Sequence, residues 1–147
     1  MAHILRRVAG AALFGALCLT GCSTADTTPQ EGMSVTVNFG DVHRCSRISP
    51  EIVVYNPPKG TQYYEVRVTT ADTPSRYLGG VRWDYGGLNE DGAQAIPEGA
   101  LSNSYRGPCP PQGAVAGGYQ YRFSVSAMSG SSSAPLAVSN YNLFLEE

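Results

Sequence analysis

The sequence predicts an all-β domain, an antiparallel β-sandwich, that follows a short N-terminal export segment. After residue 33, apolar and polar residues alternate in several short runs. Many of the 17 glycines and 10 prolines fall between these runs, and no amphipathic helical pattern occurs there. A period of two residues indicates half-buried strands, and short strands separated by Gly/Pro turns are typical of sandwiches.

The first 22 residues, MAHILRRVAGAALFGALCLTGC, have the three parts of an export signal. Arg6 and Arg7 precede an apolar run over residues 8–19. This run is too short to span a bilayer, which takes about 20 apolar residues, and it fits a secretory signal. It ends in LTGC, which resembles the bacterial lipobox, where a peptidase cuts before a cysteine that then carries lipid. Residues 1–21 are therefore predicted to be a lipoprotein signal peptide and Cys22 the lipidation site; an ordinary signal peptide with a chance cysteine is the alternative.

This signal predicts a protein of the bacterial cell envelope, held at a membrane by acyl chains on Cys22. Ser23 follows the cysteine in place of an aspartate, which favours the outer membrane, facing the periplasm, if the organism is Gram-negative. Residues 22–33 include the small, polar, aperiodic stretch STADTTPQEGM and are predicted to be a flexible tether. Residues 34–147 remain for one sandwich domain, which is long enough to bury its own core.

The charge of the mature chain argues against a nucleic-acid partner. Removal of residues 1–21 takes away two of the ten basic residues and none of the twelve acidic ones, which leaves a formal charge of −4. The remaining basic residues form no run, and Lys59 is the only lysine. Proteins that bind nucleic acids normally carry a basic patch or stripe, so none of this class is expected.

Three strands are predicted in the first half of the domain, at residues 33–39, 51–55 and 64–69. In the first and third of these, every second residue is apolar, and the second is the β-branched run EIVVY. The segment NPPKG after the second strand excludes both helix and strand. The segment ADTPS after the third is predicted to be a turn.

The sequence predicts less regular structure in the middle of the domain. Residues 81–85 are expected to form a short strand that ends at the pair Gly86-Gly87. Residues 88–104 are expected to be a loop, with a helical turn near residues 98–101.

The last part of the chain contains the clearest alternation, YQYRFSVSA at residues 119–127. A Gly/Ser-rich turn follows it. Residues 136–138 and 141–145 then supply the last strand or strands of the sandwich.

The four cysteines predict one disulfide. Cys18 leaves with the signal and Cys22 carries lipid, so Cys45 and Cys109 remain as one pair in an oxidising compartment. Two buried free thiols are the alternative. A structural zinc site takes four Cys or His ligands, and the mature chain adds only His43 to this pair, so no metal is expected.

The shortage of histidine also argues against an enzyme. A Ser-His-Asp or Cys-His site would have to use His43, which lies between two predicted strands and is expected to be a surface or capping residue. Catalytic carboxylate pairs are possible in principle, for example among Asp84, Glu90, Asp91 and Glu98, but no spacing among these residues indicates a shared site. We therefore expect neither a catalytic residue nor a cofactor.

Three stretches resemble one family. Residues 48–61 contain SPE and PPKGT, residues 68–74 read VTTADTP, and YRGPCPPQG at 105–113 precedes YRFSV at 121–125. Together they resemble the phosphatidylethanolamine-binding proteins, including the bacterial periplasmic members, over roughly residues 34–145. The chain is thus identified as a divergent lipoprotein member of that family.

The resemblance implies an antiparallel β-sandwich with a small pocket near one end that binds anions such as phosphate head groups. Asp72 and Pro74 keep the second half of the family's DPDxP segment, and Tyr119 stands at the place of one of its histidines. Arg82 stands at another and would supply a bidentate fork for an anion. The candidate pocket residues implied by the family are Asp72, Pro74, Arg82, Tyr105, Gly107, Pro108 and Tyr119.

The same family geometry implies that the loop with Cys45 neighbours the loop with Cys109. The alternative to a remodelled pocket is that Asp72 and the prolines fix only the geometry of their loops.

A second resemblance gives the alternative fold and function. The segment GYQYRFSVSAMSGSSSAP is similar to the late strands of a fibronectin type III domain, which is also an antiparallel sandwich. The two functional hypotheses are accordingly a non-enzymatic envelope lipoprotein with a small anionic or phospholipid head-group ligand, and a structural or accessory protein that binds an envelope protein through its surface. The nine tyrosines would suit such a surface, since tyrosine combines apolar area with a polar tip.

Overall fold

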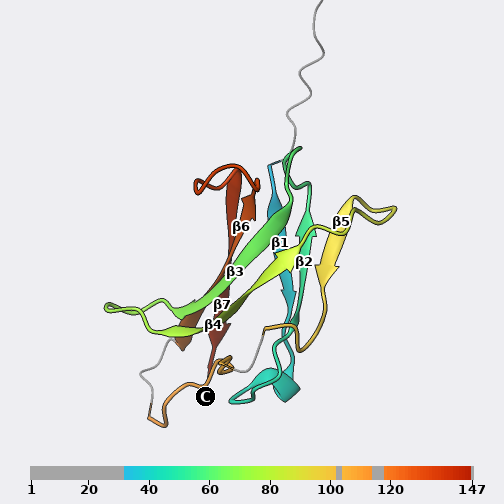
Figure 1. The fold of residues 1–147 in the computed structure, drawn as a ribbon. Helices are drawn as coiled ribbons and strands as arrows, with labels where there is room; N and C mark the ends of the chain where they lie inside the picture. Colours follow the sequence, from blue (N-terminus) through green and yellow to red (C-terminus); the bar gives the residue numbers. More distant parts are fainter. Residues whose placement is uncertain (1–31, 102–103, 114–117, 147) are drawn as a thin grey trace, which may run out of the picture. The chain divides into compact units, whose positions relative to one another are not determined.

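The computed structural model describes residues 32–101, 104–113 and 118–146. It forms two antiparallel sheets (Figure 1). The three-stranded sheet has the order β1-β2-β5, and the four-stranded sheet has the order β4-β3-β6-β7. The elements are β1 (Ser34–Asn38), the 3-10 turn η1 (Asp41–His43), β2 (Glu51–Tyr55), β3 (Tyr63–Thr70), β4 (Tyr77–Asp84), β5 (Ala93–Ile96), β6 (Tyr119–Met128) and β7 (Ala137–Leu145).

The three-stranded sheet turns its apolar residues to one face. Val35 of β1 lies opposite Val54 of β2, and Val37 lies opposite Ile52. All four side chains are buried, while their neighbours in the strands are exposed or half-buried. Two buried β-branched residues from β1 and two from β2 therefore give this sheet most of its inner surface.

The four-stranded sheet has β3 and β6 at its centre. Val66 of β3 lies opposite Val125 of β6, and Val68 lies opposite Phe123, with all four side chains buried. On the other side of β3, the pairing with β4 shifts register between Val68 and Thr69. Such a bulge places an extra residue in one strand and increases the local twist.

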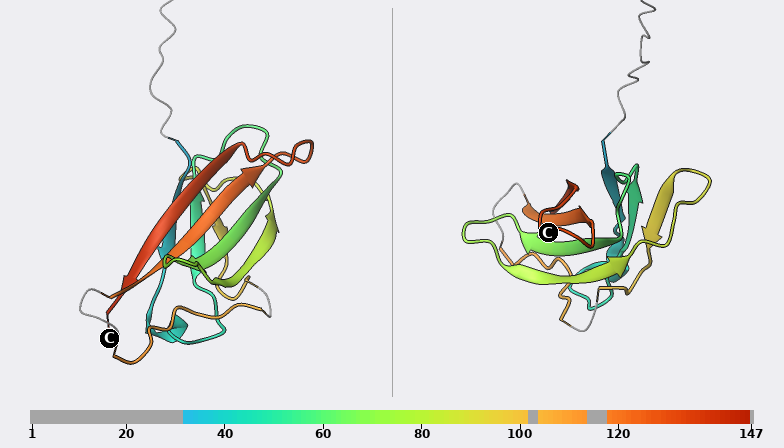
Figure 2. Two further views of the ribbon diagram at one scale, coloured as in Figure 1. Left: turned by 90° about the vertical axis from the view of Figure 1, so that its left-hand side faces the viewer. Right: turned by 45° about the horizontal axis from the view of Figure 1, so that its top comes forward.

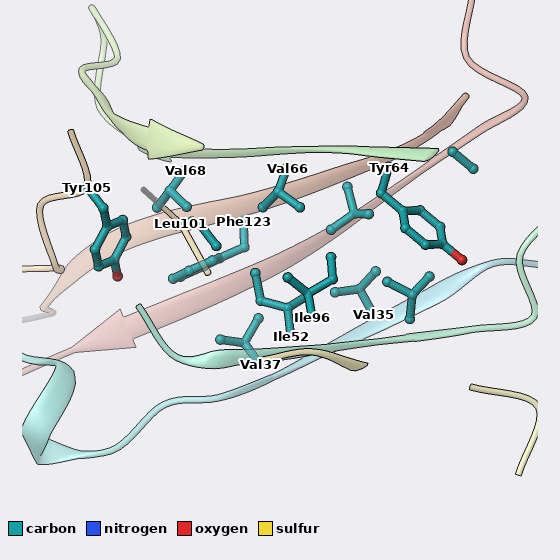
Figure 3. Packing of buried hydrophobic residues seen from close by; sticks show 13 residues of the cluster. Val35, Val37, Ile52, Tyr64, Val66, Val68, Ile96, Leu101, Tyr105 and Phe123 are labelled. Carbon is teal, nitrogen blue, oxygen red and sulfur yellow. The ribbon is translucent and has the colours of Figure 1, made fainter. Parts of the chain in front are cut away.

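The two inner surfaces pack on each other to form one core (Figure 3). The valines and Ile52 of the smaller sheet face Val66, Val68 and Phe123 of the larger one. Two fully buried tyrosines, Tyr64 and Tyr105, lie at opposite ends of this group. Apolar burial of this kind contributes about 25 cal/mol per Å² and is the main favourable term of the fold.

The predicted fold class, an antiparallel β-sandwich, is confirmed. The strands predicted at 33–39, 51–55, 64–69 and 119–127 lie within one or two residues of β1, β2, β3 and β6. The two runs predicted at the end of the chain form one continuous strand, β7. The segment ADTPS forms the predicted turn between β3 and β4.

The prediction for the middle of the chain needs correction. Residues 93–96, AQAI, are not loop but form β5, which pairs with β2. The expected helical turn near 98–101 is a hydrogen-bonded turn in which Ala100 N–H donates to the Pro97 carbonyl (3.1 Å). β4 begins at Tyr77, four residues before the predicted start at residue 81. The prediction missed these residues because Gly79 and Gly80 have no side chains and so interrupt the alternation of apolar and polar residues.

These two glycines are needed where they stand. A β carbon on Gly79 would collide with the backbone of Tyr105, and one on Gly80 would collide with the carbonyl oxygen of Val66. The chain therefore accepts two weak strand formers in β4 because neighbouring groups approach it closely.

The predicted signal peptide, Cys22 and most of the predicted tether lie outside the described residues. Within the described part, no helix has the length and apolar character that a membrane crossing requires.

A candidate ligand site at the loop end of the sandwich

One end of the sandwich, here called the loop end, carries η1, the turn between β3 and β4, and the segment 104–113 (lower part of Figure 1; Figure 2). The predicted disulfide between Cys45 and Cys109 is present there and joins Cα atoms 4.5 Å apart. Cys45 N–H donates to the Pro108 carbonyl (3.0 Å), and Gly107 N–H donates to the Ser46 carbonyl (2.6 Å). One covalent and two hydrogen bonds thus join the two loops.

Gly107 has no room for a side chain. A β carbon at this position would collide with the carbonyl oxygens of His43 and Ser46. Pro108 beside it is also buried. The pair Gly107-Pro108, which resembles the GP pair of the family, therefore lies where the two loops are in close contact.

Tyr105 fastens the same segment to the sheet. Its ring is completely buried and packs on Gly79 of β4. The next residue, Arg106, donates its N–H to the Leu78 carbonyl (2.7 Å). Burial raises the pKa of Tyr105 above its ordinary value, and its hydroxyl has no hydrogen-bond partner among the described residues. Tyr105 thus belongs to the core beneath the loop end.

The turn between β3 and β4 lies beside the start of β6. Thr70 N–H donates to the Arg76 carbonyl (2.9 Å), and Arg76 N–H donates back to the Thr70 Oγ1 (2.8 Å). Ala71 N–H donates to the Gln120 carbonyl (2.9 Å), which places the turn next to β6. The rings of Tyr119 and Tyr121 lie 6.3 Å apart on β6.

The hydroxyl of Tyr121 is the point at which these segments meet. Burial raises its pKa, the Cys109 backbone and the positive charge of Arg76 lower it, and the negative charge of Asp72 raises it. All three groups therefore lie close enough to act on this hydroxyl. The Cys109 backbone is near, but no complete hydrogen-bond geometry forms at the hydroxyl, which is buried and unpartnered.

The structure brings most of the family-implied residues to the loop end. Asp72, Pro74 and Tyr119 lie at its surface or are half-buried, and Tyr105, Gly107 and Pro108 are buried beneath. Sequence reasoning missed Arg76 and Tyr121. Arg76 follows ADTPS directly, and Tyr121 is part of the strongest alternation, but no pattern in the sequence relates the two.

The placement of Arg82 is a correction. Its side chain is 64% exposed and lies on the outer face of the four-stranded sheet, with its Cζ 3.7 Å from the centre of the Tyr63 ring. In β4, Val81 and Trp83 pack against the core, so Arg82 between them points outward. It therefore does not join Asp72 and Tyr119, and the cation near Tyr121 is Arg76.

His43 also differs in part from its prediction. It is buried instead of exposed, but it does act as a cap, because its Nδ1 accepts the Gly40 N–H (2.8 Å). Its Nε2 therefore carries the proton and donates to Glu98 Oε2 at 3.0 Å. Nδ1 thus caps the start of η1, and Nε2 holds η1 to the turn after β5.

No group of three or more Cys, His, Asp or Glu side chains in the described ranges is arranged to hold a metal ion.

A solved structure has a fold similar to that of this chain. The chain is similar to the crystal structure of YbcL from E. coli, which is described as a new member of the mammalian PEBP family (phosphatidylethanolamine-binding proteins). The TM-score is 0.57 at 18% sequence identity, over 75% of this chain and 95% of YbcL. No protein-family model matches the sequence. No curated protein matches it either.

This likeness shows that the chain has a PEBP-like fold. The fibronectin type III alternative is also a sandwich of short antiparallel strands, and the comparison supports the first of the two predictions. A shared fold does not define a function, so the site must be argued from its own residues.

Proposed function

We propose that this chain is a non-enzymatic, lipid-anchored protein of the bacterial cell envelope that binds a small anionic ligand at its loop end. The observation that supports the binding role is the meeting of three segments, distant in sequence, at the hydroxyl of Tyr121. This hydroxyl is buried, so a ligand at the loop end would contact the exposed Arg76 and the half-buried Tyr119 beside it.

The chemistry of these residues fits an oxyanion beside a cationic group. The guanidinium of Arg76 supplies positive charge and donors that suit a phosphate or carboxylate. Tyr119, half-buried at the start of β6, supplies a hydroxyl donor. Asp72 would face the positive part of a zwitterion, such as the ammonium of an ethanolamine head group.

The disulfide and the close contact at Gly107 support the same proposal. They hold the segment 104–113 against η1 without a ligand. A loop that is already ordered loses less entropy when it binds, so such a site needs fewer contacts for a given affinity.

The experiment is a thermal unfolding titration of the full-length chain in detergent with phosphoethanolamine and with inorganic phosphate. At ten times the dissociation constant, a ligand specific for the folded state adds about 1.4 kcal/mol, which is a rise of about 3–6 °C in Tm for a domain of this size. Arg76→Gln should abolish the rise, and Lys59→Gln, a matched loss of charge in the turn after β2, should keep it. Absence of any shift at millimolar concentrations of both probes would remove the small-ligand proposal.

A second candidate function is the binding of an envelope protein through the sheet surface. Val138 and Phe144 of β7 are 51% and 63% exposed, and Tyr77 of β4 is 56% exposed. The tyrosines as a set do not form this surface, because Tyr64, Tyr105 and Tyr121 are buried. A chain that shows no ligand shift but is cross-linked to one envelope protein in intact cells, and loses this cross-link in Phe144→Ser, would favour the second candidate.

A further inference from the structure

Three arginines lie along a diagonal on the outer face of the four-stranded sheet. Arg82 of β4 is opposite Glu65 of β3, and Arg67, two residues further along β3, is opposite Ser124 of β6. Arg122, two residues before Ser124, continues the same diagonal. Diagonal neighbours in a sheet are about 7–8 Å apart, so the backbone positions of Arg82, Arg67 and Arg122 form a row, here called the arginine track.

A shallow, open hollow of about 570 Å³ lies at one end of this track, and Arg67 and Arg82 are among its lining residues. Its lining also includes Gly80, which is opposite Arg67 and lies close to the Tyr77 hydroxyl. The two side chains lean apart: the Arg67 Cζ lies 5.4 Å from the centre of the Tyr77 ring, and the Arg82 Cζ lies 3.7 Å from that of Tyr63. The tyrosine rings thus hold the guanidinium groups at the two sides of the hollow.

These guanidinium groups keep donors available. In the described part of the chain, the ion pair of Arg82 is a loose one, with its Nε 3.9 Å from Asp84 Oδ1 and both side chains largely exposed. Arg122 uses its Nε to donate to Asn142 Oδ1 (3.2 Å). Each guanidinium has five N–H donors in a planar fork, so most donors remain for an anion.

The charge of this face differs from that of the chain. The whole sequence has a formal charge of −2, whereas the arginine track sets three positive charges against the two acidic side chains Glu65 and Asp84. A polyanion would therefore be attracted to this face of an otherwise acidic protein.

We propose that the arginine track binds a linear acidic polysaccharide, in which carboxylates recur along a chain of sugar units. Recurring carboxylates match recurring guanidinium groups, each of which can donate two parallel hydrogen bonds to one carboxylate. The hydroxyls of the sugars find side-chain partners beside the track in Glu65, Ser126 and Asn140, which lie on this face. The half-exposed ring of Tyr77 adds apolar area for the ring of a sugar.

An acidic peptide fits this face less well than a polysaccharide. β3 and β6 are inner strands, each paired on both sides, so the sheet already uses their backbone groups. A peptide bound by strand addition needs an open edge with free N–H and C=O groups, which the middle of this face does not offer. A polysaccharide has no such requirement, because side chains alone can satisfy its hydroxyls and carboxylates.

This proposal concerns a different face from the loop-end site and does not rest on the proposed function. Calorimetric titration of the full-length chain in detergent with hexagalacturonate at low salt is expected to show binding that weakens about tenfold when the salt concentration is raised to about 0.3 M. Arg67→Gln and Arg82→Gln should each weaken binding about three- to tenfold. Arg47→Gln, an exposed arginine outside the face, is the matched control and should leave it unchanged, with Tm checked for all variants.

Four outcomes would overturn the proposal. They are equal binding of a neutral galactose hexamer, an equal loss in Arg47→Gln, equal binding of hexaglutamate with the same dependence on the track, and complete competition by millimolar inorganic phosphate. The first two would mean that the track is not used, the third that the partner is an acidic peptide, and the fourth that the site takes a single small anion.

Discussion

Three tyrosines, Tyr64, Tyr105 and Tyr121, keep their hydroxyls inside the sandwich without a hydrogen-bond partner in the part of the chain that the structure describes. Their rings contribute to the core, while the hydroxyls oppose burial. Two of them, Tyr105 and Tyr121, lie at or beneath the loop end. At the scale of single residues, the candidate site therefore depends on polar atoms that the fold leaves unsatisfied.

The first prediction concerns Tyr105. Tyr105→Phe should leave the free energy of unfolding unchanged or raise it by up to about 1 kcal/mol, because it removes a buried hydroxyl that bonds to nothing. Tyr105→Ala, which also removes the ring, should cost about 3–5 kcal/mol. Urea unfolding of both variants measures the two values, and a clear loss in Tyr105→Phe would show that the hydroxyl has a partner.

The second prediction concerns alkaline pH. Burial, and to a lesser extent the charge of Tyr85, raises the pKa of Tyr64 from 10.0 to about 12. The unfolded chain then releases the proton first, so the stabilisation that is fully present below pH 10 is lost as the pH rises from 10 to 12. Urea unfolding across this range should show falling stability, with a smaller fall in Tyr64→Phe. A variant as steep as the parent chain would contradict this assignment.

At the scale of elements, the loop end combines a covalent link with short irregular segments. The disulfide links two cysteines that are 64 positions apart in the sequence, and the segment between them contains β2, β3, β4 and β5. His43 holds η1 to Glu98, and Gly107 allows the close contact of the two loops. The site is thus supported by contacts between loops more than by any single strand.

The third prediction follows from this closure. Replacement of both Cys45 and Cys109 by alanine should lower the free energy of unfolding by up to about 4 kcal/mol, the chain-entropy value for a loop of this length. Guanidinium unfolding of the parent chain, with and without reductant, and of the double variant measures the loss. If the reduced parent is as stable as the oxidised one, the bridge does not constrain the unfolded chain.

At the scale of the whole molecule, the sequence predicted the strands better than the surfaces. Alternation was enough for β1, β3 and β6, because each has one buried face. It failed for β5, which has only four residues and includes Gln94, and for the start of β4, where Gly79 and Gly80 have no side chains to form a pattern.

The sequence also predicted only part of the candidate site, because it does not show which side chains share a face or lie close together in space. Motif likeness brought Asp72, Tyr105 and Tyr119 to the correct end. It misplaced Arg82, because the face on which a strand residue lies depends on pairing and parity, and β4 contains an irregular register. Arg76 lies near Tyr121 because the turn between β3 and β4 is next to β6. The sequence alone does not show this proximity.

The fourth prediction concerns attachment of the complete chain. Cys22→Ser should abolish lipid attachment, because the thiol is the acceptor of the lipid, and the protein should move from the membrane fraction to the soluble fraction of the envelope. Membrane fractionation and mass spectrometry of the mature N-terminus measure this. A wild-type chain without added lipid mass would show that residues 1–21 are an ordinary secretory signal.

Trp83 is the single tryptophan of the chain and lines a second hollow, of about 510 Å³, with Gln94 and Ala95 of β5. Gln94 Nε2 also donates across this hollow to the Asp84 carbonyl (3.1 Å), a hydrogen bond from the smaller sheet to the larger one. The fluorescence of the Trp83 indole should therefore report whether the two sheets remain packed together at this hollow. A ligand at the distant disulfide-bearing end should leave that spectrum unaltered, whereas separation of the layers should shift it to longer wavelength.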